Sequence, residues 1–313
     1  MKKLISNVLL LVMCFLGCAL QTMADESHTK DMIWDETIDG IRYIHDATKD
    51  YVYVVASTVH KVIIPEEITV EGETYYVSAI QEKAFKSNTT VDTLSIPVTV
   101  TAIGNNAFDD CTALKYVEFR DTFLIKDTKF EQNNPQYIEN LSEHPVNAGY
   151  SAASSILGSN EQLFWNCSNF TTLYLGRDIT YMAGDKNKPF QDNSNLKSVD
   201  VGPQVNKINF ELFRNCENLE KVNLVNAKKL ERIEKQAFYQ CRKIDGVTIP
   251  ASVVFIGALN FQESSTTVGN LKYVTILGEE DSPVLRIDNV MSGEELGTFT
   301  NCGIENMYIG RNI

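Results

Sequence analysis

The sequence predicts a repeat solenoid, in which similar coils stack and share one elongated core. Five of the seven cysteines lie three residues after a phenylalanine, so the chain visits one structural position repeatedly. These phenylalanines recur with a base spacing of 23 residues, and a fixed period of roughly 20 to 50 residues is typical of solenoids. Each unit also contains a strand-like alternation of apolar residues that ends at proline or glycine.

Eight phenylalanines mark the predicted coils. They are Phe85, Phe108, Phe164, Phe190, Phe213, Phe238, Phe261 and Phe299. Successive spacings are 23, 56, 26, 23, 25, 23 and 38 residues, which places a long insertion in two of the coils. Three residues after each phenylalanine comes a small polar side chain, which we expect to face the interior and bond to backbone groups that a turn leaves free. These ladder residues are Asn88, Cys111, Cys167, Asn193, Cys216, Cys241, Ser264 and Cys302.

The coil over residues 238–260 shows the internal pattern most clearly. Val247 and Ile249 alternate with polar residues, as in a half-buried strand, and Pro250 then ends the strand. A second short apolar stretch follows at 253–256. Each coil is therefore predicted to contain a parallel β-strand, a corner, a second extended piece and a short helical turn.

This pattern resembles the BspA-like, treponemal-type leucine-rich repeat family. Residues 81–313 match the family pattern almost throughout, and the best stretches are Ala107–Val117 and Ala237–Pro250. The phrases Leu173–Arg177 and Met307–Arg311 look like a variant repeat of gut-bacterial members. The resemblance implies a leucine-rich-repeat stack in a secreted or surface protein with an adhesive or recognition role.

The N-terminus is typical of a signal peptide, which we place at residues 1–24. Two lysines precede an apolar run that ends at Leu20 and is too short for a stable membrane span. Cleavage after Ala24 would release a secreted chain. The phrase Phe15–Cys18 also resembles a lipobox, in which case Cys18 would become a lipidated N-terminus on the cell surface or outer membrane. Both routes stay open.

The mature chain is predicted to form one elongated domain. Its segments are an exposed leader at 25–39, an N-terminal β cap at 40–80 and the solenoid at 81–313, with insertions at 120–163 and 277–298. Within the cap, Glu71-Gly72 lies between alternating apolar runs and predicts a β-hairpin. Because the solenoid stops within a coil, we expect this chain to be a piece of a longer protein, truncated at its C-terminus.

The cysteines are expected to be free thiols. Cys216 and Cys241 belong to successive coils without a long insertion, and stacked strands about 4.8 Å apart bring such a pair within reach of a disulfide. Buried cysteine nevertheless usually behaves as a small apolar residue. The sequence leaves the state of this one pair open.

The charge and the motifs exclude several function classes. A net charge of −13 disfavours binding to nucleic acid and anionic lipid. The four histidines are scattered, and neither a metal-ligand pattern, a nucleophile elbow nor a phosphate-binding loop is present. We therefore predict no catalytic activity, no metal and no cofactor.

Tyrosines are the candidate binding residues. If the apolar residues of each strand point inward, the residues between them line the outer face of the sheet. Tyr116, Tyr174, Tyr273 and Tyr308 fall on that face, and tyrosine is enriched at binding surfaces. The alternative is that tyrosine simply favours sheet exteriors. Trp165 is expected to pack at the edge of its coil rather than to bind sugar.

The predicted function is recognition of an extracellular protein or glycoprotein, which the family resemblance implies to be of host matrix or mucosal origin. The contacts would come from the extended sheet face or from the insertion loops. Two alternatives remain: a spacer that presents another domain, and a glycan-binding protein that uses its insertions.

Overall fold

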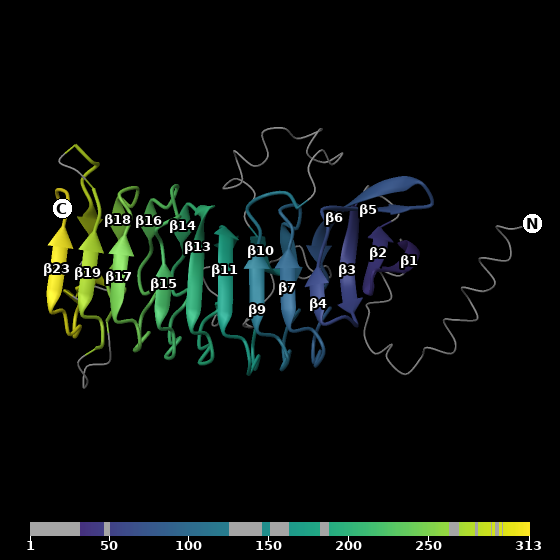
Figure 1. Ribbon diagram of the computed structural model, residues 1–313, viewed down its shortest axis with the longest axis horizontal. Helices are drawn as coiled ribbons and strands as arrows, with labels where there is room; N and C mark the ends of the chain where they lie inside the picture. The colour runs from purple at the N-terminus through teal and green to yellow at the C-terminus, as the bar shows by residue number, and fades with distance from the viewer. Residues whose placement is uncertain are drawn as a thin grey trace, which may run out of the picture.

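The computed structural model is an elongated solenoid whose coils follow one another along a single axis (Figure 1). It describes residues 32–46, 51–124, 146–150, 163–181, 188–262, 269–278, 281–288, 290–291, 294–295 and 297–313. Most of the first insertion lies outside these ranges. Over the described residues, the predicted stack of coils with parallel strands is confirmed.

Each coil contributes one strand to a parallel layer, here called the sheet face (Figure 1). Its described strands are β4 (Lys61–Ile63), β7 (Thr93–Ile96), β9 (Tyr116–Phe119), β11 (Thr172–Arg177), β13 (Ser198–Gln204) and β15 (Lys221–Asn223), followed by β17 (Gly246–Ile249), β19 (Tyr273–Ile276) and β23 (Asn306–Ile309). Apolar and outward positions alternate along a strand. In β9, for example, Val117 and Phe119 are buried whereas Tyr116 and Glu118 are partly exposed.

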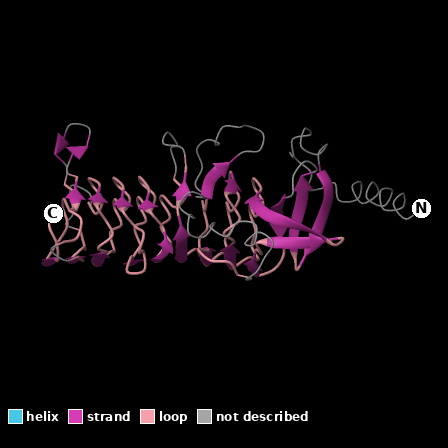
Figure 2. Ribbon diagram, turned by 90° about the horizontal axis from the view of Figure 1, so that it is seen from above, coloured by secondary structure: helices cyan, strands magenta, loops and turns pink. Residues whose placement is uncertain are grey.

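A second layer of shorter strands closes each coil on the opposite side, and Figure 2 shows the two layers seen from above. Its described strands are β8 (Ala102–Gly104), β10 (Val146–Tyr150), β12 (Ile179–Thr180), β14 (Lys207–Ile208), β16 (Arg232–Ile233), β18 (Phe255–Ile256) and β20 (Arg286–Ile287). The second insertion also forms a small antiparallel pair, β21 (Val290–Met291) and β22 (Glu294–Glu295).

The N-terminal strands continue the second layer as a cap. They are β1 (Met32–Ile38), β2 (Ile41–Asp46), β3 (Tyr51–Ser57), β5 (Glu67–Val70) and β6 (Glu73–Ile80). The predicted hairpin is confirmed, because Glu71 and Gly72 adopt φ angles of 52° and 87° between the antiparallel strands β5 and β6.

The predicted leader differs from the structure. Residues 32–38 pair as β1 with β2, although the side chains from Asp35 to Thr37 are exposed. Asp39 and Gly40 have φ angles of 51° and 78°, so they form a hairpin turn of the Asp-Gly type. The predicted boundary at 39/40 therefore cuts through this turn, and the cap begins earlier.

The predicted helical turns are single hydrogen-bonded turns, and the described residues contain no helix (Figure 2). Two residues after the anchor phenylalanine, the backbone is left-handed in seven coils, which stops a helix from continuing. These residues, with φ of 55–60°, are Ser87, Asp110, Asn166, Asp192, Asn215, Gln240 and Asn301. Asparagine and aspartate tolerate this conformation better than most residues do.

The anchor phenylalanines form one unbroken stack through the core. Ring centroids of successive anchors lie 5.0–5.6 Å apart. Phe108 and Phe164 are 56 residues apart in the chain, yet their rings stack at 5.0 Å and 3°. Such pairs contribute about 0.5–1.5 kcal/mol each beyond their buried area. The insertions therefore leave the core stack uninterrupted.

Candidate functional site

The ladder cysteines join adjacent coils through their thiols. Each thiol donates to the backbone carbonyl oxygen of the anchor phenylalanine in the preceding coil, with Sγ···O distances of 2.9–3.1 Å. The pairs are Cys111–Phe85, Cys167–Phe108, Cys216–Phe190, Cys241–Phe213 and Cys302–Phe261. All five are free thiols, Cys216 and Cys241 included. Burial raises the pKa of Cys216, which favours the neutral thiol that acts as donor.

Asparagine takes the ladder position in two coils and bonds differently. The Asn88 amide donates to the Ser57 carbonyl oxygen at 2.8 Å, and its oxygen accepts two backbone N–H groups of its own turn. Asn193 also accepts two N–H groups of its own turn. Ser264 and the predicted lipidation site Cys18 lie outside the described residues.

The four candidate tyrosines form two separate pairs on the sheet face. Tyr116 on β9 and Tyr174 on β11 are diagonal neighbours across paired strands. Tyr273 on β19 and Tyr308 on β23 have the same relation. The strands β13, β15 and β17 separate the two pairs (Figure 1), so the tyrosines do not make one continuous surface.

The first pair is fixed to the scaffold. The Tyr174 hydroxyl donates to the Asp121 carboxylate at 2.7 Å. It also lies over Gly202, where a Cβ would come within 2.6 Å of the hydroxyl oxygen. Burial, followed by the hydrogen bond to Asp121, raises the pKa of Tyr174, and burial likewise raises that of the half-buried Tyr116. These two rings therefore contribute mainly to the structure of the sheet face.

The second pair is free to meet a partner. Tyr273 is 49% exposed and Tyr308 is 63% exposed. Tyr308 corresponds to Tyr174 in the repeated phrase that ends in Gly-Arg. At the place of Asp121, however, the second insertion carries Gly278, which has no carboxylate to hold the hydroxyl. The same framework position thus presents a tethered ring in one copy and an exposed ring in the other.

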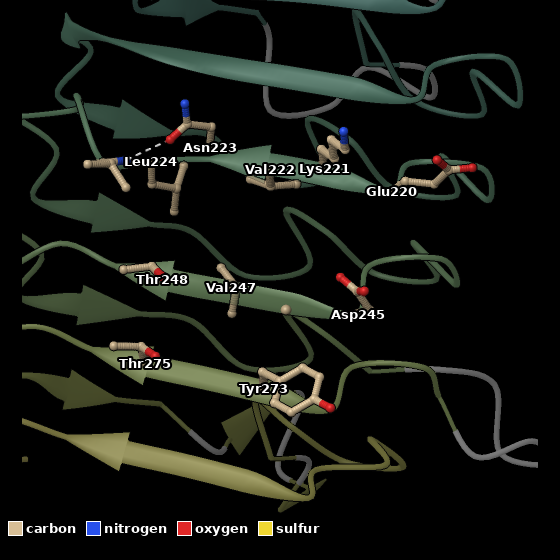
Figure 3. Close-up of a pocket in the computed structure, with 12 residues that line it drawn as sticks. Glu220, Lys221, Val222, Asn223, Leu224, Asp245, Val247, Thr248, Tyr273 and Thr275 are labelled. Carbon is tan, nitrogen blue, oxygen red and sulfur yellow. Dashed lines mark hydrogen bonds between the residues drawn. The ribbon is translucent and has the colours of Figure 1, made fainter.

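A shallow hollow of about 370 Å³ lies beside Tyr273 on the sheet face (Figure 3). It forms where β15 and β17, which follow one another in the array, belong to separate sheets. Gly246 lies directly opposite Tyr273 in the strand register and adds no side chain to the space. Glu220 and Asp245, at the amino ends of β15 and β17, line one end of the hollow. The hollow therefore offers an aromatic wall and two carboxylates.

Two buried arginines, whose role the sequence did not reveal, fix the coils around the insertions. Arg177 is fully buried and donates to three carbonyl oxygens of the turn at 97–100, at 2.6–2.9 Å. Arg311 donates in the same way to the turn at 250–253. Each arginine reaches back across the coil that carries an insertion. The signal in the sequence is the Gly-Arg pair that follows each insertion coil.

The described ranges hold no group of three histidine, cysteine or carboxylate side chains that could bind a metal ion. Within the same part of the chain, no helix has the length and apolar character needed to cross a membrane.

Comparison with known proteins identifies the repeat. A family model for the BspA type leucine rich repeat region matches in 6 copies, over residues 50–147, 78–184 and 153–268. A leucine rich cell surface protein from Faecalibacterium prausnitzii is 25% identical, with a TM-score of 0.47 over 85% of this chain and 61% of that protein. The present chain therefore spans 61% of the length of that relative.

Two further solved structures are more distant. The T. pallidum leucine rich repeat protein is 20% identical, with a TM-score of 0.37 over 67% of this chain and 91% of its own. A leucine-rich repeat protein from Bacteroides ovatus is 17% identical, with a TM-score of 0.28 over 82% and 90%. No curated protein matches this chain significantly. The repeat matches cover most of the chain, and they agree with the stacked coils and the phenylalanine spine. The chain belongs to the BspA-type leucine-rich repeat family.

Proposed function

We propose that this chain is an exported, non-catalytic recognition protein of the bacterial cell surface, which binds an extracellular protein or glycoprotein of host matrix or mucosal origin. The family supports a protein-interaction role for the repeats in general. The signal-peptide pattern at residues 1–24 supports export, either as a secreted chain or as a lipoprotein anchored at Cys18.

The observation that carries the proposal is the exposed tyrosine pair next to the hollow on the sheet face. Tyr273 and Tyr308 present large, rigid, amphipathic rings, which are typical anchors at protein interfaces. The space left by Gly246 beside Tyr273 lets a partner side chain enter between the strands. The paired strands β17, β19 and β23 hold this surface in place before binding, so little ordering entropy opposes association.

The test compares the two tyrosine pairs. The double variant Tyr273→Ser with Tyr308→Ser should weaken binding to immobilised matrix proteins or mucin by at least about tenfold. The matched control, Tyr116→Ser with Tyr174→Ser, removes the tethered pair and should retain binding if it folds. Circular dichroism and thermal unfolding would verify the fold of both. Loss of binding only in the control would move the site to β9 and β11.

The alternative function is a spacer that presents another domain. A spacer would be indifferent to both double variants and to removal of all four tyrosines together. Unchanged adhesion in the quadruple variant, with an intact fold, would therefore refute recognition through the sheet face.

A further inference from the structure

A second candidate site lies on the turn edge of the solenoid, away from the sheet face. Along this edge, three kinds of hydrogen bond join successive coils. The first is the thiol bond of the ladder cysteines. The second runs from the N–H of the left-handed residue to a carbonyl of the next coil, as from Asp192 to Arg214 at 2.8 Å. The third runs from an asparagine amide to the preceding coil, as from Asn218 to the Ser194 carbonyl oxygen at 2.6 Å.

Between the coils of Phe164 and Phe190, all three bonds are missing. Asn193 replaces the ladder cysteine, and its Nδ2 group donates to no described residue. The N–H of Asn166, the left-handed residue of its coil, donates to no described carbonyl. Asn195, the counterpart of Asn218, likewise makes no side-chain bond in the described part of the chain. The core is nevertheless regular here, because the two phenylalanine rings stack at 5.4 Å.

The missing bonds open a hollow of about 470 Å³, which is within the range of small-ligand sites, roughly 300–1,000 Å³. Trp165 forms one wall, and its side chain is 53% exposed rather than packed against the coil edge as the sequence suggested. Asn193 is 8% exposed and reaches the hollow with unused amide donors. Amide, hydroxyl and carboxylate groups complete the lining, and no lysine, arginine or histidine belongs to it.

We propose that this hollow binds a pyranose ring of a neutral glycan. The C–H face of a sugar ring would stack on Trp165, because ring hydrogens carry slight positive charge and the indole face is negative. The amides of Asn193 and Asn195 would hydrogen-bond sugar hydroxyls, since an amide offers a donor and an acceptor side by side, as a hydroxyl does. The site requires no part of the insertions.

The lining favours a neutral sugar over other ligands. A nucleotide or an anionic sugar would need a cation to neutralise its charge, and Asp192 at the rim would repel it. A peptide side chain would be bound best by a predominantly apolar hollow, whereas this one is lined mainly by polar groups. The proposal goes beyond protein recognition by the sheet face and does not depend on it.

Tryptophan fluorescence gives a direct test, because the chain has only two tryptophans. In a Trp34→Phe background, Trp165 is the single reporter. The probes are glucose, galactose, mannose and N-acetylglucosamine with their neutral disaccharides, then a sialylated trisaccharide and an unrelated neutral peptide. We expect saturable quenching or a spectral shift with at least one neutral sugar, and none with the anionic sugar or the peptide.

Two variants and one control locate the binding, measured by isothermal titration calorimetry with the intact Trp34 protein. Trp165→Ala should weaken the binding of the active sugar by at least about tenfold. Asn193→Cys introduces the thiol that five other coils bond to the preceding phenylalanine, so it should fold and yet lose binding. Tyr239→Ala removes the aromatic residue at the position equivalent to Trp165 in the coil of Phe238 and should bind normally.

Failure has distinct forms. Absence of saturable binding for every neutral sugar would overturn the proposal, as would sugar binding that survives Trp165→Ala. Binding of the peptide or the sialylated probe alone, lost in Trp165→Ala, would assign the hollow to another ligand class and overturn the glycan assignment. None of these results bears on the tyrosine variants of the sheet face, so the two proposals can fail independently.

Discussion

The guanidinium of Arg177 donates to the carbonyl oxygen of Pro97, 80 residues earlier in the chain, at 2.6 Å. Arg311 makes the corresponding bonds to the turn at 250–253. In regular coils, the strand of the sheet face is followed by a proline-led turn. In a coil that carries an insertion, the chain leaves at that point. The arginine of the next coil crosses the vacated place and satisfies carbonyl groups that would otherwise be buried without a donor.

Arg177→Met should destabilise the protein strongly. Methionine fills a similar length but leaves the three carbonyl oxygens without their donor, and we expect a loss of about 3 kcal/mol or more. Arg242→Met is the control, because Arg242 forms a surface ion pair with Glu217 at 3.4 Å and should cost less than about 1 kcal/mol. Urea unfolding measures both variants. Equal midpoints for the two would contradict a structural role for Arg177.

Gly176→Ala should also be destabilising, whereas Gly246→Ala should be neutral or stabilising. A Cβ on Gly176 would lie 2.3 Å from the carbonyl oxygen of Phe119, where the first insertion departs, and overpacking of this kind costs about 1–3 kcal/mol. A Cβ on Gly246 would meet nothing closer than 3.5 Å. The difference in melting temperature between these variants is the measurement, and a stable Gly176→Ala protein would argue against the close approach.

Alkylation should distinguish the ladder cysteines by exposure. Cys111, Cys167, Cys216 and Cys241 are buried, while Cys302 is partly exposed. Burial raises the pKa of Cys216, and contact with Cys111 followed by burial raises that of Cys167, so little thiolate forms near neutral pH. Iodoacetamide labelling followed by peptide mass spectrometry should modify Cys302 first in the native state. Labelling of Cys216 at the same rate would indicate that the coils open readily.

Asp178 should make the stability depend on pH in the acidic range. It is 4% exposed and accepts the N–H groups of Asn206 and Lys207, but burial outweighs these bonds and raises its pKa above 3.8. The protonated form is therefore favoured on folding, and this contribution is lost as pH rises from about 4 through the folded pKa.

Asp178→Asn keeps an acceptor oxygen and removes the titration. Relative to this variant, the wild-type protein should lose free energy of unfolding as pH rises through that window. Parallel urea titrations at several pH values would show the effect, and identical pH dependence of the two proteins would contradict it.

The fold could be predicted in large part because a repeated burial pattern leaves a repeated trace. The anchor phenylalanines, the period-2 strands and the Glu71-Gly72 hairpin all follow from local sequence. The predicted helical turns were wrong because the left-handed residue before each ladder position depends on the turn geometry. Asparagine or aspartate at Asp110, Asn166 and Asn215 was nevertheless a visible signal.

The candidate sites were less predictable because they arise where neighbouring coils differ. The sequence places the tyrosines on the outer face, but only the strand register shows that Asp121 holds Tyr174 while Tyr308 has no such partner. Similarly, Asn193 looked equivalent to the ladder cysteines. Its unused amide becomes visible only when the bonds on either side of it are compared.

The continuous phenylalanine stack has a consequence for how this domain can change. Phe108 and Phe164 keep the same ring spacing across 56 residues that Phe213 and Phe238 keep across 25. The length of the rod is therefore counted in rings and not in residues. Insertions can grow, shrink or be exchanged between relatives without changing the distance between the two ends, so new loops can be tried on a scaffold whose reach stays constant.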